Sequence, residues 1–137
     1  MVNVYVGGSY AGRARIKKEA ELLGSYPGYN ILSRWYNDED FIEKAWDKKL
    51  NGRPAEAMAM CDTYAILDAQ LVIIDTFEPS TTGGRYAELG AAIMRKLLGH
   101  PLRVVHIGPP TNIFETLTRE HYDDWRAFFR RLEAARQ

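Results

Sequence analysis

Residues 71–77, LVIIDTF, form the strongest strand pattern in the chain and constrain its fold more than any other segment. An apolar strand of this kind is typical of a parallel sheet covered by helices on both faces, because neither face then meets water. Shorter strand patterns occupy 2–8, 29–35 and 102–108, and a fifth strand is expected at 113–117, IFETL. The chain is therefore expected to build a sheet around residues 71–77.

Helix patterns lie between these strands, so the two kinds of element alternate along the chain. Helices are predicted over 12–24, 54–70, 84–98 and 123–136, with Gly24 and Gly99 expected to end the first and third. Residues 36–53 are polar with scattered aromatic side chains, and we interpret them as an excursion over the sheet. The alternation predicts one domain over 1–137 with an α/β fold, a doubly wound, flavodoxin-like parallel sheet of about five strands with helices on both faces.

The composition argues against several classes of function. Lys and Arg together number 18, as do Asp and Glu, so no net charge draws the chain to a nucleic acid polymer or an anionic membrane. Cys61 is the only cysteine, and the three histidines lack the spacing of a helical metal site. No apolar run reaches the ~18–20 residues of a membrane span, and the N-terminus has no basic leader. We therefore expect a cytoplasmic protein.

Ligands of doubly wound sheets bind outside the carboxyl ends of the strands, which points to three loops. These loops read GGSYAGR after the first strand, DTFEPSTTGGRYAE after the third and GPPTN after the fourth. The run TTGG is able to present backbone N–H groups to an oxyanion or a phosphate, although it is neither a Walker loop nor a dinucleotide fingerprint. Plain turns, turn capping and core packing are the competing explanations for these residues. The candidate binding residues are Gly7, Gly8, Ser9, Tyr10, Asp75, Thr82, Gly83 and Gly84.

Glu88 is out of place among its neighbours on the helix over 84–98. The surrounding residues are small and apolar, which suits a helix packed closely against other groups. Such surroundings are unfavourable for a charged carboxylate. A capping box would need Ser or Thr three residues earlier, and that position is Arg85. The remaining structural explanation is a glutamate near the helix N-terminus that pairs with Arg85 or Arg95.

Asp62 interrupts an apolar side of the helix over 54–70 in the same way. Its neighbours on that side are Ala, Met and Ile, and burial of an unpaired carboxylate costs several kcal/mol. A second apolar patch on the same helix (Met60, Tyr64 and Leu67) leaves the buried side open, and a bond from Asp62 to the backbone is an alternative. Two carboxylates in one cleft, one nucleophilic and one able to hold a proton, are what glycosyl transfer needs.

Several of these motifs together resemble the nucleoside 2-deoxyribosyltransferase superfamily, which includes nucleoside 5′-monophosphate N-glycosidases. The resemblance lies in VNVYVGGSY at the start, CDTYAILDAQLVIID before and within the third strand, and GGRYAELGAA around Glu88. The 26-residue separation of Asp62 and Glu88 and the later segment HIGPPTNIFETLTREHYDDW also resemble the family. The similarity covers roughly the whole chain and is loose over 30–55.

The resemblance implies an enzyme in which Glu88 attacks C1′ of a (deoxy)ribosyl group. Asp62 would protonate the departing base or hold the sugar hydroxyls, and the sugar would pass to a second base or to water. It implies no cofactor, a nucleoside or nucleotide substrate, a free base as a further acceptor, and a homo-oligomer in which Asn112 lies near a neighbouring subunit's site. Thr82 stands where the transferases have Asp for the sugar 5′-hydroxyl, which favours a 5′-monophosphate substrate held by Ser9, Thr82, the backbone at 83–84 and Arg13 or Arg85.

Three other functions compete with this one. A phosphoribohydrolase of the cytokinin-activating type has a partly similar glycine-rich motif, but it needs Gly-Thr at 86–87, where this chain has Tyr86 and Ala87. A non-catalytic nucleotide-binding module is compatible with the same fold, because fold alone does not determine function. A structural or partner-binding protein is the third alternative.

Overall fold

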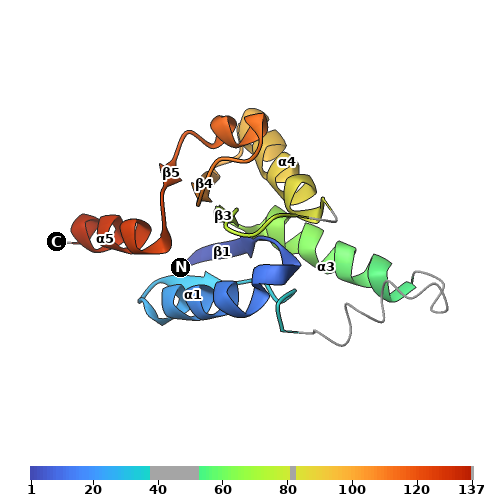
Figure 1. Ribbon diagram of the computed structural model, residues 1–137, viewed down its shortest axis with the longest axis horizontal. Coiled ribbons are helices and arrows are strands. Elements are labelled where there is room, and N and C mark those ends of the chain that lie inside the picture. Colours follow the sequence, from blue (N-terminus) through green and yellow to red (C-terminus); the bar gives the residue numbers. More distant parts are fainter. Residues whose placement is uncertain (38–52, 81–82, 137) are drawn as a thin grey trace.

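The computed structural model describes residues 1–37, 53–80 and 83–136, and it has the α/β architecture that the sequence predicts. Five parallel strands form one sheet in the order β2-β1-β3-β4-β5, a flavodoxin-like arrangement (Figure 1). The strands are β1 (Val2–Gly7), β2 (Tyr29–Ile31), β3 (Leu71–Asp75), β4 (Arg103–Ile107) and β5 (His121–Tyr122).

Helices cover both faces of the sheet, as predicted. The α-helices are α1 (Arg13–Ser25), α3 (Arg53–Asp68), α4 (Gly84–Leu97) and α5 (Trp125–Ala135), and two short 3-10 helices are η1 (Tyr10–Gly12) and η3 (Ile113–Thr118). Helices α1 and α5 lie on one face, where Tyr26 stacks on Phe129 with ring centroids 5.6 Å apart, and α3 and α4 lie on the other (Figure 1). None of the described helices is long and apolar enough to cross a membrane.

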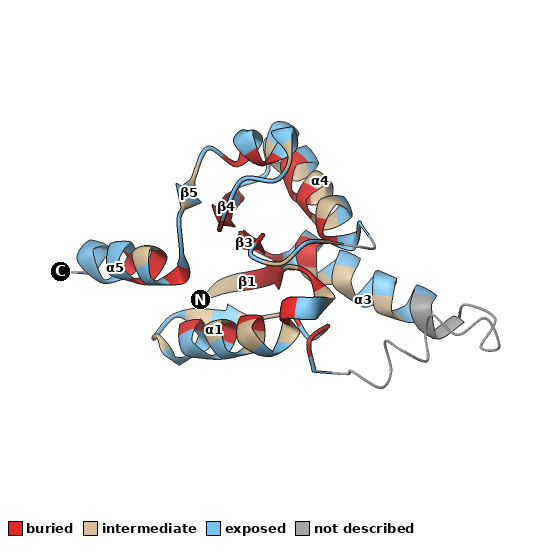
Figure 2. Ribbon diagram, in the orientation of Figure 1, coloured by how far each residue is buried: buried red, intermediate tan, exposed pale blue. Residues whose placement is uncertain are grey.

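The core is centred on β3, whose five residues are all buried between the two helix layers (Figure 2). Adjacent strands β1 and β4 add Val4, Val6, Val104 and Val105, none of which is exposed. The apolar pattern at 71–77 therefore marks the centre of the sheet, and burial on both faces explains why this strand shows no alternation.

Most predicted boundaries differ from the structure by one or two residues, and two of the differences have a visible cause. Gly24 does not end the first helix, which continues to Ser25 before a turn that contains Gly28 at φ +91°. The strand predicted over 29–35 ends at Ile31. Beyond this residue, hydrogen bonds from side chains take the place of the backbone hydrogen bonds between β2 and β1. Ser33 Oγ accepts a hydrogen bond from Val6 N at 3.2 Å, and Trp35 Nε1 donates to Val6 O at 2.7 Å. Most of the excursion predicted over 36–53 lies outside the described residues.

The fifth strand was predicted in the wrong place. Residues 113–117 belong to the 3-10 helix η3, because the Asn112 side chain accepts a hydrogen bond from Phe114 N and caps the helix. The strand that extends the sheet is instead β5, in which His121 pairs with His106. The apolar side chains that suggested a strand at 113–117 point largely to solvent, with Ile113 77% exposed.

Candidate functional site

The three loops predicted to carry the site lie side by side, because β1, β3 and β4 are neighbours in the sheet. Ser9 Oγ, in the loop after β1, donates to Pro79 O at 2.8 Å in the loop after β3. Thr76 Oγ1 donates to Pro109 O at 2.7 Å and joins the loops after β3 and β4. Hydrogen bonds thus connect the three loops at the carboxyl edge of the sheet.

Glu88 extends from the second turn of α4 to the first strand. The hydroxyl group of Tyr5, whose side chain is fully buried on β1, donates a hydrogen bond of 2.7 Å to Glu88 Oε1. The other oxygen, Oε2, is buried and has no hydrogen-bond partner among the described residues. It lies so close to Gly7 that a Cβ at that position would overlap it. Gly7 is therefore required for the Glu88 carboxyl group to reach this place.

The surroundings of Glu88 disfavour its charged form. Burial raises its pKa from 4.5 to about 8, the Tyr5 hydrogen bond acts in the opposite direction, and the nearby charge of Asp62 adds to the increase. The proposed pairing with arginine is absent: Arg85 donates to Glu78 O at 2.7 Å, and Arg95 donates to Ile66 O at 2.7 Å. Neither structural explanation for Glu88 holds among the described residues.

Asp62 lies on the buried side of α3, which settles the question that the two apolar patches left open. Ile66 and Ala69 on its side are 3% and 1% exposed, whereas Met60, Tyr64 and Leu67 are 47–58% exposed. Asp62 itself is half-buried and forms no hydrogen bond to the described residues. Burial raises its pKa from 3.8 to about 6. Asp62 is close enough to Glu88 and Tyr5 for its charge to raise the pKa of each.

The glycines that open α4 are exposed, one turn before Glu88. Gly83 is the N-cap of α4 at φ +78°, a left-handed conformation that favours glycine; its N–H donates to Ser80 Oγ at 3.3 Å, and no side chain among the described residues caps the first turn of the helix. A Cβ at Gly83 or Gly84 would meet no described atom within 4 Å. Gly8 differs, because a Cβ there would overlap Ile16 Cδ1, so its role is to let α1 approach β1. Thr82 lies outside the described residues.

The other predicted binding residues are further from the two carboxyl groups or already have partners. Ser9 is buried, and its hydroxyl group also accepts from Ala11 N. The ring of Tyr10 lies under the Arg13 guanidinium, 4.0 Å from its centroid. Asn112 caps η3, and no contact joins it to Glu88 or Asp62 in the described part of the chain.

Asp75 has a different environment at the end of β3. Its fully buried carboxylate accepts hydrogen bonds of 2.7 and 2.8 Å from the Arg15 guanidinium, 2.7 Å from Trp125 Nε1 and 3.1 Å from Phe77 N. Arg15 also binds Glu78, whose pKa is lowered chiefly by that bond. In this structure Asp75 joins α1, α5 and the loop after β3.

Sequence reasoning missed three residues that shape this edge: Tyr5, Arg15 and Trp125. A tyrosine inside a buried strand needs a partner for its hydroxyl group, and this requirement was the available signal for Tyr5. Gly7, two residues along the same strand, faces the same side as Tyr5. Arg15 and Trp125 are ordinary members of amphipathic helices in the sequence, and nothing in the pattern connects them to Asp75.

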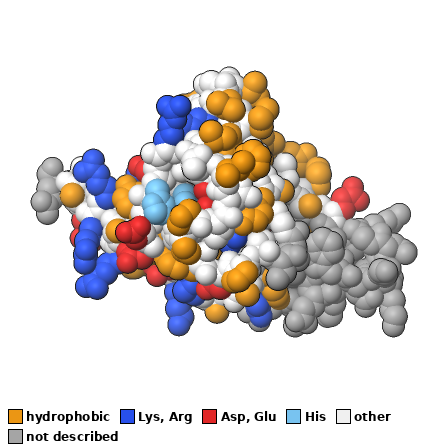
Figure 3. Space-filling model, turned by 45° about the horizontal axis from the view of Figure 1, so that its top comes forward, with side chains coloured by type: hydrophobic (Ala, Val, Ile, Leu, Met, Phe, Trp, Pro, Cys, Tyr) orange, Lys and Arg blue, Asp and Glu red, His pale blue; other side chains and the backbone are white. Residues whose placement is uncertain are grey.

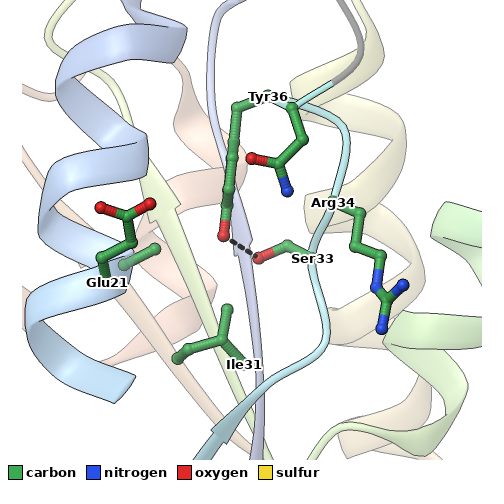
Figure 4. Close-up of a pocket in the computed structure, with 7 residues that line it drawn as sticks. Glu21, Ile31, Ser33, Arg34 and Tyr36 are labelled. Atoms are coloured by element: carbon green, nitrogen blue, oxygen red, sulfur yellow. Dashed lines mark hydrogen bonds between the residues drawn. The ribbon is translucent and has the colours of Figure 1, made fainter. Parts of the chain in front are cut away.

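A shallow pocket of about 220 Å³ lies between α1 and the segment that follows β2 (Figure 4). Figure 4 shows Tyr36 bonded to Ser33 across its wall, with Glu21 on the facing helix. None of the predicted site residues lines it; the lining residues are Ala20, Glu21, Ile31, Ser33, Arg34, Tyr36 and Asn37. The pocket is therefore separate from the Glu88 site.

Comparison with protein-family models found no match, and comparison with curated proteins found no significant match. The relation to the deoxyribosyltransferases therefore remains a prediction from the motifs. Among the described residues, no group of three or more His, Cys, Asp or Glu side chains is arranged to hold a metal ion.

Proposed function

We propose that the protein cleaves the N-glycosidic bond of a (deoxy)nucleoside or its 5′-monophosphate through a covalent glycosyl-Glu88 intermediate. One observation carries the proposal: the Glu88 carboxyl group is buried at the carboxyl edge of the sheet with one oxygen held by Tyr5 and the other unpartnered, beside Asp62. Perturbed carboxyl groups of this kind concentrate at functional sites, and a pair of them is the machinery of glycosyl transfer.

The two carboxyl groups divide the reaction between them. The Glu88 carboxylate forms a bond to C1′ while the bond from C1′ to the base nitrogen breaks, and the electron pair of that bond leaves with the base. Asp62, with a pKa of about 6, supplies the proton that makes the base a better leaving group, or alternatively holds the sugar hydroxyl groups. A second base or water then attacks C1′, loses a proton, and releases Glu88.

Tyr5 is the residue that prepares Glu88 for this role. A nucleophilic carboxylate must be ionised, and burial alone favours the protonated form. The Tyr5 hydrogen bond lowers the pKa of Glu88 against that effect and fixes Oε1, which leaves Oε2, beside Gly7, as the oxygen without a hydrogen bond. Tyr5 is a positioning residue in this scheme.

A nucleotide-level substrate fits the loop before α4. The backbone at Gly83 and Gly84 is exposed, and the N-terminus of α4, which no described side chain caps, favours an anion such as a 5′-phosphate. Of the two arginines considered for this role, Arg85 is only 2% exposed and bonds Glu78 O and Tyr86, so it supports the loop. Release of free base from a dNMP tests this part, and turnover of nucleosides alone would contradict it.

The proposal extends to the setting of the reaction. The protein would act in nucleotide metabolism or salvage in the cytoplasm, as a homo-oligomer whose site lies near the subunit interface. Asn112 would then approach the site of a neighbouring copy. A free base would serve as acceptor if the reaction is transfer, and no cofactor is needed for either outcome.

A non-catalytic nucleotide-binding module is the second candidate, and the raised pKa of Glu88 favours it. A carboxyl group with a pKa of about 8 is mostly protonated at neutral pH and is able to donate a hydrogen bond to a base. Glu88→Gln separates the two functions, because glutamine keeps the shape and the donor. A binder would retain its affinity for the nucleotide by calorimetry, whereas a catalyst would retain affinity and lose turnover.

The function as a whole is tested by incubating the protein with a panel of (deoxy)nucleosides and (deoxy)nucleotides, each with and without a second base. Chromatography then separates the products. Free base alone indicates hydrolysis, and an exchanged base indicates transfer. Intact substrates throughout the panel, with wild-type protein that binds them, would replace the enzyme proposal by the binding module.

A further inference from the structure

An uncovered apolar surface lies on the side of the molecule formed by α3, α4 and η3. Nine of the twelve exposed large hydrophobic side chains in the described residues belong to these elements and the α4 C-cap. They are Met60, Tyr64, Leu67, Met94, Leu97, Leu98, Ile113, Phe114 and Leu117, and their exposed fractions run from 45% to 77%. We refer to these nine as the apolar face.

The apolar face is continuous across the three elements. Met60, Tyr64 and Leu67 follow one side of α3, since residues three and four apart are neighbours on a helix. Helix α4 packs against α3 and against η3, so the three groups of side chains lie on neighbouring elements. Figure 3 shows hydrophobic side chains gathered over the part of the surface where α4 and η3 lie. An exposed apolar area of this kind marks an interaction site.

Charged groups beside the apolar face are turned toward the protein's own backbone. Arg95 Nη1 donates to Ile66 O at 2.7 Å and to Ala69 O at 2.8 Å, which ties α4 to the end of α3. Lys96 Nζ lies 3.4 Å from Thr118 O and ties α4 to η3. The three elements are thus held together as one surface before any partner arrives, and a preformed surface loses less entropy on binding.

Small residues continue the apolar face along α4 toward Glu88. Ala87, Gly90 and Ala91 lie on the same side of the helix as Met94, and they are exposed or half-buried. A Cβ at Gly90 would meet no described atom within 4 Å. This side of α4 therefore allows the backbone of another helix to approach closely.

The area suits a stable dimer. Taking about 200 Å² for a fully exposed large side chain, the exposed fractions correspond to on the order of 1,000 Å², compared with about 800 Å² per partner in a standard interface. All nine side chains are uncharged, and the exposed charges of Glu56 and Asp68 lie at the ends of the α3 stripe. An apolar centre with a charged margin is typical of interfaces between identical subunits.

We propose that the apolar face binds the same face of a second copy of this chain. Two identical uncharged surfaces meet without like-charge repulsion, and a two-fold axis makes one patch complementary to itself. The α3 and α4 helices of both copies would pack together over an interior of Leu, Met and Ile. The inference names the surface for the homo-oligomer in the proposed function, yet it rests only on exposure, area and charge.

The test compares matched substitutions on opposite faces of the sheet. Leu97→Glu, at a position 73% exposed, and Ile113→Glu, at a position 77% exposed, place a charge in the apolar face; Leu22→Glu does so on α1, at a position 48% exposed. Mass is measured by sedimentation or light scattering at about 50 µM chain, since dimer content depends on concentration. Circular dichroism and thermal unfolding check each fold.

We expect the mass of two chains for the wild type and for Leu22→Glu. Leu97→Glu and Ile113→Glu should weaken the dimer at least about 100-fold and yield folded single chains, because each buries a charge against apolar groups. A monomeric wild type, which would assign the face to a different partner, or dimers that survive both substitutions would overturn the proposal. If one variant fails to fold, the other decides. Base release is not measured, so failure of the proposed chemistry leaves this result unaffected.

Discussion

Two pairs of acidic residues lie at the carboxyl edge of the same sheet and have opposite environments. Asp75 and Glu78 share the Arg15 guanidinium, and Asp75 has further donors in Trp125 and the backbone of Phe77. Glu88 has one donor, Tyr5, and Asp62 has no hydrogen bond to the described residues. The pKa of Glu78 is lowered by Arg15, whereas burial raises those of Glu88 and Asp62.

The difference separates acidic residues that hold the fold from those that are available to a ligand. A buried carboxylate with all its acceptor positions filled stabilises the elements that donate to it. A buried carboxyl group with an unpartnered oxygen costs stability and is retained for another reason. The comparison predicts that substitution of the first pair affects folding and that substitution of the second affects activity.

The largest expected effect is the loss of activity in Glu88→Gln. The amide cannot attack C1′, so base release should fall at least about 10³-fold while nucleotide binding persists. Base release is measured by chromatography with the substrate that the panel identifies. The matched control is Glu78→Gln, which breaks a half-buried ion pair with Arg15 and should keep activity within about threefold. Equal losses in both variants would show that the two pairs do not differ in function.

Asp75→Ala should have the largest effect on stability. The substitution removes the buried carboxylate that accepts hydrogen bonds from Arg15, Trp125 Nε1 and Phe77 N. The free energy of unfolding should therefore fall by about 3 kcal/mol. Urea unfolding gives this value directly, and the melting temperature should fall by roughly 10 °C. A loss below about 1 kcal/mol would mean that the network is not structural.

Tyr5→Phe is expected to slow the reaction in a pH-dependent way. Removal of the hydroxyl donor raises the pKa of Glu88 further above about 8, so a smaller fraction of Glu88 is ionised at neutral pH and kcat/KM should fall there. Activity should fall about tenfold at neutral pH and recover toward the wild-type value at high pH. A uniform decrease at every pH would instead indicate a packing defect.

The last expected effect is a pH-dependent gain in the stability of Glu88→Gln. The pKa of Glu88 is 4.5 in an unperturbed chain and about 8 in the fold. Between these values the unfolded chain releases the proton that the folded protein keeps, so wild-type stability falls as pH rises. The melting temperature of Glu88→Gln relative to the wild type should therefore increase from pH 5 to pH 9. A constant difference would mean that Glu88 is not desolvated in the fold.

The sequence was sufficient to predict the two unpaired carboxyl groups because each interrupts an apolar pattern. Glu88 lies among small residues and Asp62 lies among Ala, Met and Ile, and a charge in such surroundings is visible without coordinates. The sheet was predictable for a related reason, since an apolar run at 71–77 requires helices on both sides.

The partners of these residues were not predictable, because they come from distant segments. Tyr5 and Glu88 are 83 residues apart, and Trp125 and Asp75 are 50 apart. The misplaced fifth strand has a different cause. Ile113, Phe114 and Leu117 have the composition of a buried strand, and the fold exposes them on the apolar face instead. A sequence pattern does not distinguish an intramolecular core from a surface that a second copy covers.

The most direct test of the account is mass spectrometry of the protein quenched during turnover with its substrate. We expect the peptide that contains Glu88 to carry an added (deoxy)ribosyl or (deoxy)ribosyl-phosphate group, and we expect Glu88→Gln to carry none. Base release by the wild type with no adduct on Glu88, or with an adduct on another carboxylate, would contradict the assignment of Glu88 as the nucleophile.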